Sequence, residues 1–234
     1  MLNNLIKRIS ILRRKILYKK ISYSFGGVDL LINYLFKEKK KGFYVDVGAQ
    51  HPISNNNTYL LFKKGWNGIN IDLDYENISL FNLVRKNDLN ICTALSSKNT
   101  ELDLYFYHNK SPINTVEKNV AESQRAKVKE IKKIKTTTLN SLLDTNNVGH
   151  INYLNIDVEG HELSVLKGFD MIAHKPDVIS IEYLDLKMKE LEFRNNKLDN
   201  VLNSNLYKHM VKNNYSLINW NHADLIFINN SFKN

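Results

Sequence analysis

Residues 155–162 (Asn-Ile-Asp-Val-Glu-Gly-His-Glu) carry several ionisable side chains directly after an apolar run. Asp157 and Glu159 are two residues apart, so an extended backbone points both carboxylates to the same side. With His161 they could balance a cationic ligand, hold a divalent metal such as Mg²⁺, or orient and deprotonate a hydroxyl group. In the competing, structural interpretation Glu159 and Glu162 cap the following helix and His161 lies at the surface.

A second group, residues 46–51 (Asp-Val-Gly-Ala-Gln-His), ends another apolar run. Gly48 permits a tight turn and lets a ligand approach the backbone. The chain lacks the G-x-G-x-x-G pattern of pyrophosphate-binding loops, which disfavours NAD and FAD and favours a nucleoside ligand without phosphates. Asp72 ends the next apolar run and can accept hydrogen bonds from both ribose hydroxyls. Alternatively, Asp72 stabilises the N-terminus of the following helix, and Asp74 is a nearby competitor.

These side chains need a scaffold, and the surrounding sequence alternates strand and helix patterns. Strands are predicted over 42–48, 68–73, 89–95, 151–158 and 178–183, helices over 54–64, 76–86, 161–168 and 196–213, and a closing antiparallel pair over 215–220 and 224–228. The alternation predicts an α/β fold with a parallel sheet covered on both faces. Ligands of such sheets bind beyond the carboxyl ends of the strands, where the candidate residues lie.

Residues 108–135 interrupt this alternation. From residue 116 onward the pattern is helical and rich in lysine. A charged run of this kind is typical of a solvated helix face. The alternative is a lid or an acceptor-side insertion over the ligand pocket.

Residues 1–24 hold seven basic residues and no acidic one, whereas the remaining chain is nearly neutral. Apolar residues at helical spacing predict a basic amphipathic helix. This helix either packs on its own domain or contacts an anionic membrane surface. Nucleic acid is a weaker third option, because no nucleic-acid module follows. The net charge of +9 therefore does not indicate a polyanionic substrate, and we expect no nucleic-acid partner.

The single cysteine, Cys92, excludes a disulfide framework and a zinc ribbon and favours a reducing compartment. The sequence has no run of 18 apolar residues and no pattern of a secretory signal. We expect a cytoplasmic protein, and attachment to the inner face of the membrane through residues 1–24 is the second option.

Three segments resemble the FkbM family of S-adenosylmethionine-dependent methyltransferases. They are residues 44–52 (Tyr-Val-Asp-Val-Gly-Ala-Gln-His-Pro), 64–72 (Lys-Gly-Trp-Asn-Gly-Ile-Asn-Ile-Asp) and 156–168 (Ile-Asp-Val-Glu-Gly-His-Glu-Leu-Ser-Val-Leu-Lys-Gly). The third segment is the most specific, because a D-V-E-G-x-E-x-x-V-L-K-G run after an apolar strand is hard to obtain by chance. The resemblance covers about residues 40–185.

The resemblance implies a methyltransferase domain over residues 25–234 with a Rossmann-like fold: a mostly parallel seven-stranded sheet, helices on both faces and an antiparallel last strand. It implies S-adenosylmethionine as cofactor and O-methylation of a sugar or another hydroxyl-bearing small molecule, often in glycan or natural-product pathways. The implied cofactor-binding residues are Asp46, Gly48, Ala49, Gln50, Asp72, Ala94, Ser96 and Asp157. The candidate bases are Asp157, Glu159, His161 and His51, and the candidate ligands of a Mg²⁺ ion are Asp157 and Glu159.

Three positions depart from the family pattern. Pro52 stands where glycine is usual, Asn155 where lysine is frequent and Asn140 where aspartate is frequent. Pro52 keeps open the alternative of a module that binds a nucleoside or a sugar without catalysis. A nucleic-acid methyltransferase is disfavoured, because Asp157-Val-Glu-Gly stands in place of the aromatic-proline motif on which a flipped base stacks.

Overall fold

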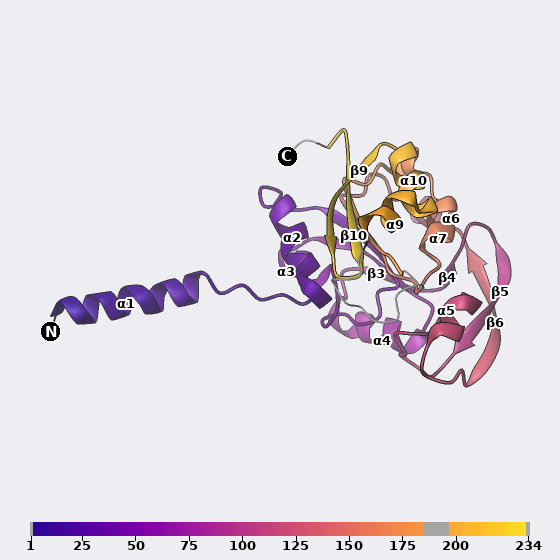
Figure 1. Cartoon of the computed structure of the whole chain (residues 1–234), viewed down its shortest axis with the longest axis horizontal. Helices are drawn as coiled ribbons and strands as arrows, with labels where there is room; N and C mark the ends of the chain where they lie inside the picture. The colour runs from indigo at the N-terminus through magenta and orange to yellow at the C-terminus, as the bar shows by residue number, and fades with distance from the viewer. Residues whose placement is uncertain (1, 185–196, 233–234) are drawn as a thin grey trace.

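A seven-stranded sheet forms the centre of the protein (Figure 1), whose computed structural model describes residues 2–184 and 197–232. Its strands are β1 (Phe43–Val47), β2 (Asn67–Asp72), β3 (Leu89–Cys92), β7 (Tyr153–Ile156), β8 (Val178–Glu182), β9 (Tyr215–Asn221) and β10 (Asp224–Asn229). They lie in the order β3-β2-β1-β7-β8-β10-β9. Among the described strands of this sheet, β10 alone runs in the opposite direction to the other six and is antiparallel to β8 and β9. The predicted mostly parallel sheet with an antiparallel last strand is confirmed.

Helices cover both faces of this sheet, as predicted. They are α2 (Val28–Leu35), α3 (Tyr59–Lys63), α4 (Tyr75–Val84), α6 (Leu139–Thr145), α7 (Glu162–Lys167), α8 (Met171–His174), α9 (Leu198–Asn203) and α10 (Asn205–Lys212), with a short turn η1 (Phe25–Gly27) before α2. Successive strand residues point to opposite faces. Tyr44 and Tyr153 therefore pack with α2 and α3, whereas Val45 and Leu154 pack in the larger core with α6, α7, α9 and α10.

The segment after β3 forms a second, smaller sheet. It contains β4 (Ala94–Leu95), β5 (Thr100–Phe106) and β6 (Glu130–Thr137), and α5 (Lys118–Ser123) lies between β5 and β6. The helix predicted from residue 116 to 135 is wrong beyond Ser123. β6 pairs antiparallel with β5 along its whole length, for example Ile134 with Leu102. This pairing supplies backbone hydrogen bonds to a strand whose lysines are depleted in β-structure but whose Ile and Thr residues favour it.

Three predicted element boundaries shift for local reasons. The helix predicted over 54–64 begins only at Tyr59, because the side-chain oxygen of Asn56 holds the preceding turn through the backbone N–H groups of Thr58 and Tyr59. The strand predicted over 89–95 is divided between the two sheets. The helix predicted over 196–213 is two helices, because Ser204 ends α9 and caps α10; residue 196 lies outside the described residues.

Helix α1 (Leu2–Leu17) lies apart from the rest of the protein (Figure 1). The large apolar side chains from Leu5 to Leu17 are each at least 54% exposed. Packing of this helix on its own domain, one of the two main interpretations of its pattern, is therefore not what the structure shows. No helix within the described residues is long and apolar enough to cross a membrane.

Candidate active site

A pocket opens at the carboxyl ends of β1, β2 and β7, and residues 111–116 form another part of its wall. The parallel register places Val47 opposite both Ile71 and Ile156, so the loops that follow these strands meet at one edge. Of the residues predicted from the sequence, the lining contains Gly48, Gln50, Asp72, Ala94, Asp157, Glu159 and His161. Asp46, Ala49, His51 and Ser96 are not part of this lining. Ala49 is buried in the core, and the other three are described below.

Gly48 forms the tight turn that the sequence predicts. Its φ of 76° lies in the left-handed region, and its N–H donates to the carbonyl oxygen of Ile71 at 2.8 Å. A Cβ atom at this position would lie 1.6 Å from the backbone oxygen of Asp157. Only glycine therefore allows the loops after β1 and β7 to approach this closely.

Asp72 and Asp74 have different roles. Asp74 caps α4 by accepting a hydrogen bond from the N–H of Glu76. The carboxylate of Asp72 accepts from the N–H groups of Gln50 at 2.9 Å and Asp74 at 2.7 Å, and the residue is 8% exposed. Burial raises the pKa of Asp72, and the two backbone hydrogen bonds oppose this shift. The assignment of Asp72 to the ribose hydroxyls remains a prediction.

Asp46, predicted to bind the cofactor, faces a buried polar network instead of the pocket. Its carboxylate accepts hydrogen bonds from Asn56, Thr58 and Asn155 at 2.7–3.0 Å, and the residue is 1% exposed. Asp46 therefore acts on the site indirectly, by fixing the loop after β1. Asn155 stands where lysine is frequent in the resemblance, and its amide joins Asp46 to the neighbouring strand β8 through Ser180.

The same network explains how Pro52 is accommodated. The guanidinium of Arg85 is fully buried and donates to the carbonyl oxygen of Pro52 at 2.7 and 2.9 Å. It also donates to Asn56 and Thr58, which hold Asp46. The buried side chain of Arg85 thus holds the backbone of the loop that contains Pro52. Asn140 is structural too, because its side-chain oxygen accepts from the N–H of Asp170 at 3.2 Å.

The two histidines predicted as bases have their ring nitrogens engaged. Nδ1 of His51 accepts hydrogen bonds from the N–H groups of Ile53 and Ser54. In the neutral ring the proton therefore sits on Nε2, which then donates and cannot accept a proton from a substrate. His161 contacts Glu117 through Nδ1 at 2.5 Å and Ser96 Oγ through Nε2 at 2.9 Å. This contact also accounts for Ser96, which holds a histidine instead of lining the pocket.

His161 belongs to a set of contacts that fasten the segment between β5 and β6 across the pocket. Glu117 comes from this segment and pairs with His161 on the loop after β7. The hydroxyl of Thr115 donates to the backbone oxygen of Glu159 at 2.7 Å. The N–H of Lys110 donates to the carboxylate of Asp74 at 2.6 Å. The predicted lid or acceptor-side insertion is thus attached to both sides of the pocket, over residues 110–117.

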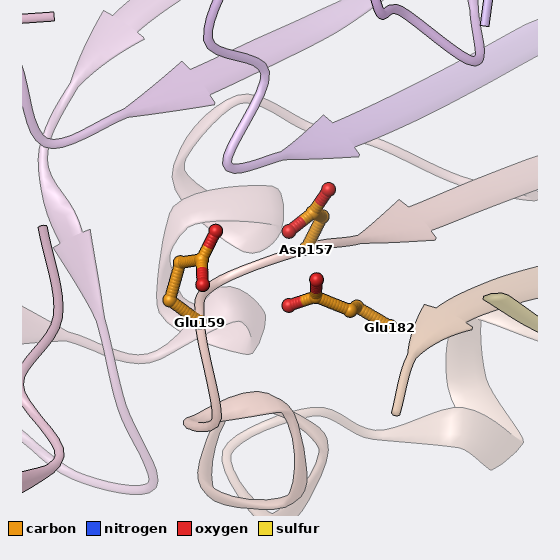
Figure 2. A group of neighbouring side chains, drawn as sticks. All are labelled: Asp157, Glu159 and Glu182. Carbon is orange, nitrogen blue, oxygen red and sulfur yellow. The ribbon is translucent and has the colours of Figure 1, made fainter. Parts of the chain in front are cut away.

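Three carboxylates meet at the floor of the site. Asp157, Glu159 and Glu182 each offer an oxygen within 4.8 Å of the others, and Figure 2 shows the three side chains pointing toward one another. Glu159 has a φ of 55°, a backbone strain that is commonly retained where a side chain has a functional position. Glu162, the first residue of α7, accepts from the N–H groups of Val158 and Gly160, so it holds the loop before the helix and does not cap the helix as the structural interpretation expected.

Burial raises the pKa of each carboxyl group in this cluster, and neighbouring carboxylates add to the rise. The pKa of Asp157 rises to about 6, mainly through burial and also through Asp46 and Asp72. The pKa of Glu159 rises to about 9 through burial, Asp157 and Glu162. The pKa of Glu182 lies well above its ordinary value for the same reasons. At neutral pH Asp157 is therefore ionised, whereas Glu159 holds its proton.

Glu182 is the residue that the sequence analysis missed. It is the last residue of β8, inside a strand predicted over 178–183, and the rule that selected Asp157 and Asp72 at strand ends also applies to it. Its Oε2 atom is buried and has no hydrogen-bond partner in the described part of the chain. Asp224 faces it across the pair of β8 and β10, and burial raises the pKa of Asp224 to about 7.

A family model described as the methyltransferase FkbM domain matches residues 46–210, which include the carboxylate cluster and the pocket loops. The chain belongs to this family. Among solved structures it is similar to a TehB-like SAM-dependent methyltransferase from Corynebacterium glutamicum, with 11% identity, 97% of each chain covered and a TM-score of 0.43. Curated proteins give no match. The resemblance inferred from three short segments is confirmed.

As an FkbM-family protein the chain is a methyltransferase that uses S-adenosylmethionine, which when bound supplies a methyl group on a sulfonium cation. The pocket suits this group. Its walls include the apolar side chains of Val47, Ile71 and Leu95, and its polar side carries Asp72 and Asp157. No lysine or arginine is among the described residues that line it, which suits a nucleoside without phosphates.

Proposed function

We propose that this FkbM methyltransferase methylates a hydroxyl group of a sugar or of a glycan-related small molecule. The observation that carries the proposal is the cluster of Asp157, Glu159 and Glu182 beside the cofactor pocket. A sugar hydroxyl is too weakly acidic to ionise at neutral pH, so a positioned base that accepts its proton during attack gains about 10²–10⁴-fold in rate. Carboxylates also accept hydrogen bonds from hydroxyl groups, which fixes the acceptor near the methyl group.

Within the cluster we assign the base to Asp157. Its pKa of about 6 leaves it ionised at neutral pH, whereas Glu159, with a pKa of about 9, keeps its proton. Protonated Glu159 can donate a hydrogen bond to another oxygen of the acceptor, and ionised Asp157 can take the proton of the attacking hydroxyl. The two roles need carboxyl groups whose pKa values differ, which is what the cluster provides.

Polar groups of the insertion support a hydroxyl-rich ligand. Ser111, Asn114 and Thr115 line the pocket. The hydroxyl of Ser111 is buried and makes no hydrogen bond within the described residues. A buried hydroxyl without a partner is unfavourable, and a polar ligand group that pairs with it would remove this penalty.

The other two functions fit the site less well. A flipped base needs aromatic or apolar side chains on which to stack, and no Phe, Tyr or Trp is among the described residues that line the pocket. A module that only binds would not need three buried carboxyl groups whose pKa values are raised by burial and by neighbouring carboxylates.

A divalent cation is the alternative to direct proton transfer within this same function. Carboxylate oxygens are the ligands that Mg²⁺ prefers, and the three oxygens of the cluster lie close enough together to share one ion. Equal rates before and after treatment with EDTA would favour the base. A loss of activity that Mg²⁺ restores would favour the metal.

We also propose a cytoplasmic location and a place in polysaccharide biosynthesis. The single, exposed Cys92 supports a reducing compartment. In cells, deletion of the gene should remove one methyl ether from a surface glycan, as detected by mass spectrometry of its sugars. An unchanged set of methylated sugars contradicts this role.

The purified protein provides the direct test. It is incubated with S-adenosylmethionine that carries a labelled methyl group and with a panel of glycosides, nucleotide sugars, a protein extract and duplex DNA. The proposal expects label in a sugar, as an ether stable to mild base. Label that enters only protein or DNA contradicts it.

A further inference from the structure

Helix α1 presents an apolar stripe that nothing in the described part of the chain covers. Leu5, Ile9, Leu12 and Ile16 follow one another at intervals of four, three and four residues, which places them on one face of the helix. Their side chains are 54–68% exposed. Helices of this length are only marginally stable alone in water, and most helical stability in proteins comes from packing of the apolar face. The stripe therefore requires a partner surface.

The opposite face of α1 indicates what that surface is. Lys7 and Arg14 lie two turns apart on it, whereas Arg8 and Lys15, also two turns apart, lie along one side of the apolar stripe. Arg13 lies beside the apolar stripe, where its long side chain can bury its stem and keep its charge in water. The first turn of α1 contains no acidic residue, and the first acid of the chain is Asp29. A cationic face together with an apolar stripe matches the interface of an anionic lipid bilayer. There the apolar side chains enter the acyl region and the basic side chains contact the anionic headgroups.

The attachment point of α1 lies at the active-site edge of the sheet. The backbone oxygen of Tyr23 accepts a hydrogen bond from the N–H of Asn56, which follows β1. The neighbouring Asn57 donates to Asn155 at 2.9 Å, two residues before Asp157. On the other side, Asn221 donates to the backbone oxygen of Gly26 at 2.7 Å.

Only residues 18–22 separate the end of α1 from Tyr23. Five residues span at most about 18 Å. A membrane that holds α1 would therefore also hold the edge of the sheet with the carboxylate cluster close to the lipid surface.

We propose that α1 docks in the surface of an anionic membrane and that the enzyme works on an acceptor attached to that membrane. The evidence for membrane docking comes from α1 alone and does not depend on the proposed function. The acceptor class rests on the proposed function, because it assumes that the cluster beside the attachment point transfers methyl groups to a hydroxyl. The charge of residues 1–24 thus describes where the enzyme works and not what it methylates.

The test is co-sedimentation of the full chain with two kinds of vesicle. One kind contains phosphatidylcholine alone, and the other also contains about 30 mol% phosphatidylglycerol, which gives it a clearly negative surface. We expect at least tenfold tighter binding to the anionic vesicles, weakening at high salt. We also expect more helical signal in circular dichroism on binding. Equal binding to both vesicle types contradicts the proposal. Tighter binding to a duplex oligonucleotide than to the anionic vesicles also contradicts the proposal. A stable dimer that forms through α1 in the absence of lipid contradicts it too.

Two variants and a matched control separate the contributions of the two faces. Ile9→Asn with Leu12→Asn removes the apolar stripe, and Arg13→Glu with Arg14→Glu and Lys15→Glu reverses the charge. Each should reduce vesicle binding at least tenfold. The control, Lys98→Glu with Lys208→Glu and Lys212→Glu, makes the same change in net charge at exposed positions of the domain and should leave binding within about twofold. A control that loses binding as fully as the α1 charge variant would overturn the role of α1.

The readouts keep this inference distinct from the proposed function. Both α1 variants should bind S-adenosylmethionine as the wild type does, because α1 lies apart from the rest of the protein (Figure 1) and none of its residues lines the pocket. Failure of vesicle binding with normal methyl transfer to a soluble sugar refutes the docking alone. Vesicle binding without any transfer to sugars refutes the proposed function and leaves the docking standing.

Discussion

Gly48 and Asp157 touch backbone to backbone at the ends of neighbouring strands: a Cβ atom on Gly48 would lie 1.6 Å from the carbonyl oxygen of Asp157. The contact joins the loop of the cofactor pocket to the loop of the carboxylate cluster. The sheet register sets it, because Val47 and Ile156 are partners in adjacent parallel strands. One shared contact therefore positions the loop of the cofactor pocket and Asp157, the base that we propose, and a change at Gly48 should disturb both.

Gly48→Ala should weaken S-adenosylmethionine binding at least tenfold, because the added methyl group must push the two loops apart. Isothermal titration calorimetry measures the binding, and urea unfolding measures the stability. The matched control is Gly65→Ala. Gly65 has a similar φ of 87°, but a Cβ atom there meets nothing within 4 Å. The control should lose only about 1 kcal/mol of stability from backbone strain and keep its affinity. Equal losses of affinity in both variants would show that backbone strain, and not the overlap with Asp157, is responsible.

Stability of the ligand-free protein should fall as pH rises from about 4.5 toward 9. The pKa of Glu159 rises from 4.5 to about 9 in the folded state, so the folded protein binds more protons than the unfolded chain in this window. Glu159→Gln removes this titration. The variant should be more stable than the wild type near pH 9, by an amount on the order of 1 kcal/mol or more, and its melting temperature should depend less on pH.

The control for the pH experiment is Glu38→Gln, which removes an exposed acid. Its melting curve should follow that of the wild type at every pH. A Glu159→Gln curve parallel to that of the wild type would mean that the carboxyl group of Glu159 does not titrate abnormally.

His161→Phe should act as a loss of positioning and not as loss of the base. Both ring nitrogens of His161 already contact Ser96 and Glu117, so its removal loosens the segment that crosses the pocket. We expect KM for both substrates to rise severalfold. The acidic limb of the pH–rate profile, with an apparent pKa near 6, should remain because it belongs to Asp157. Glu117→Ala should reproduce the same effects. Disappearance of the acidic limb in His161→Phe would instead identify His161 as the base.

The sequence predicts the sheet and the strand-end residues well, because both follow from local patterns. The apolar runs locate β1, β2 and β7, and the residues that follow them include Gly48 and Asp157. Prediction from the sequence fails where the role of a residue depends on a partner that is distant in the chain. Glu117 lies 44 residues from His161 in the chain, and no local pattern connects them. Asp46 lies near the end of β1, where a ligand-binding acid is expected. Its carboxylate instead accepts hydrogen bonds from the side chains of Asn56, Thr58 and Asn155.

The charged segment before Thr137 shows the same limit in secondary structure. Lysines at irregular spacing resemble a solvated helix, yet residues 130–137 pair with β5 and form a strand. Glu182 was missed for a different reason. It needed only the strand-end rule that selected Asp72, and applying that rule to every predicted strand would have found it.

The most direct test of the central claim is the turnover of Asp157→Asn with S-adenosylmethionine and a sugar acceptor, measured together with cofactor affinity. The amide keeps the size of the side chain but cannot accept the hydroxyl proton. We expect kcat to fall by about 10²–10⁴-fold, with cofactor binding retained within severalfold. A kcat close to that of the wild type would contradict the role of Asp157 as the base in methyl transfer.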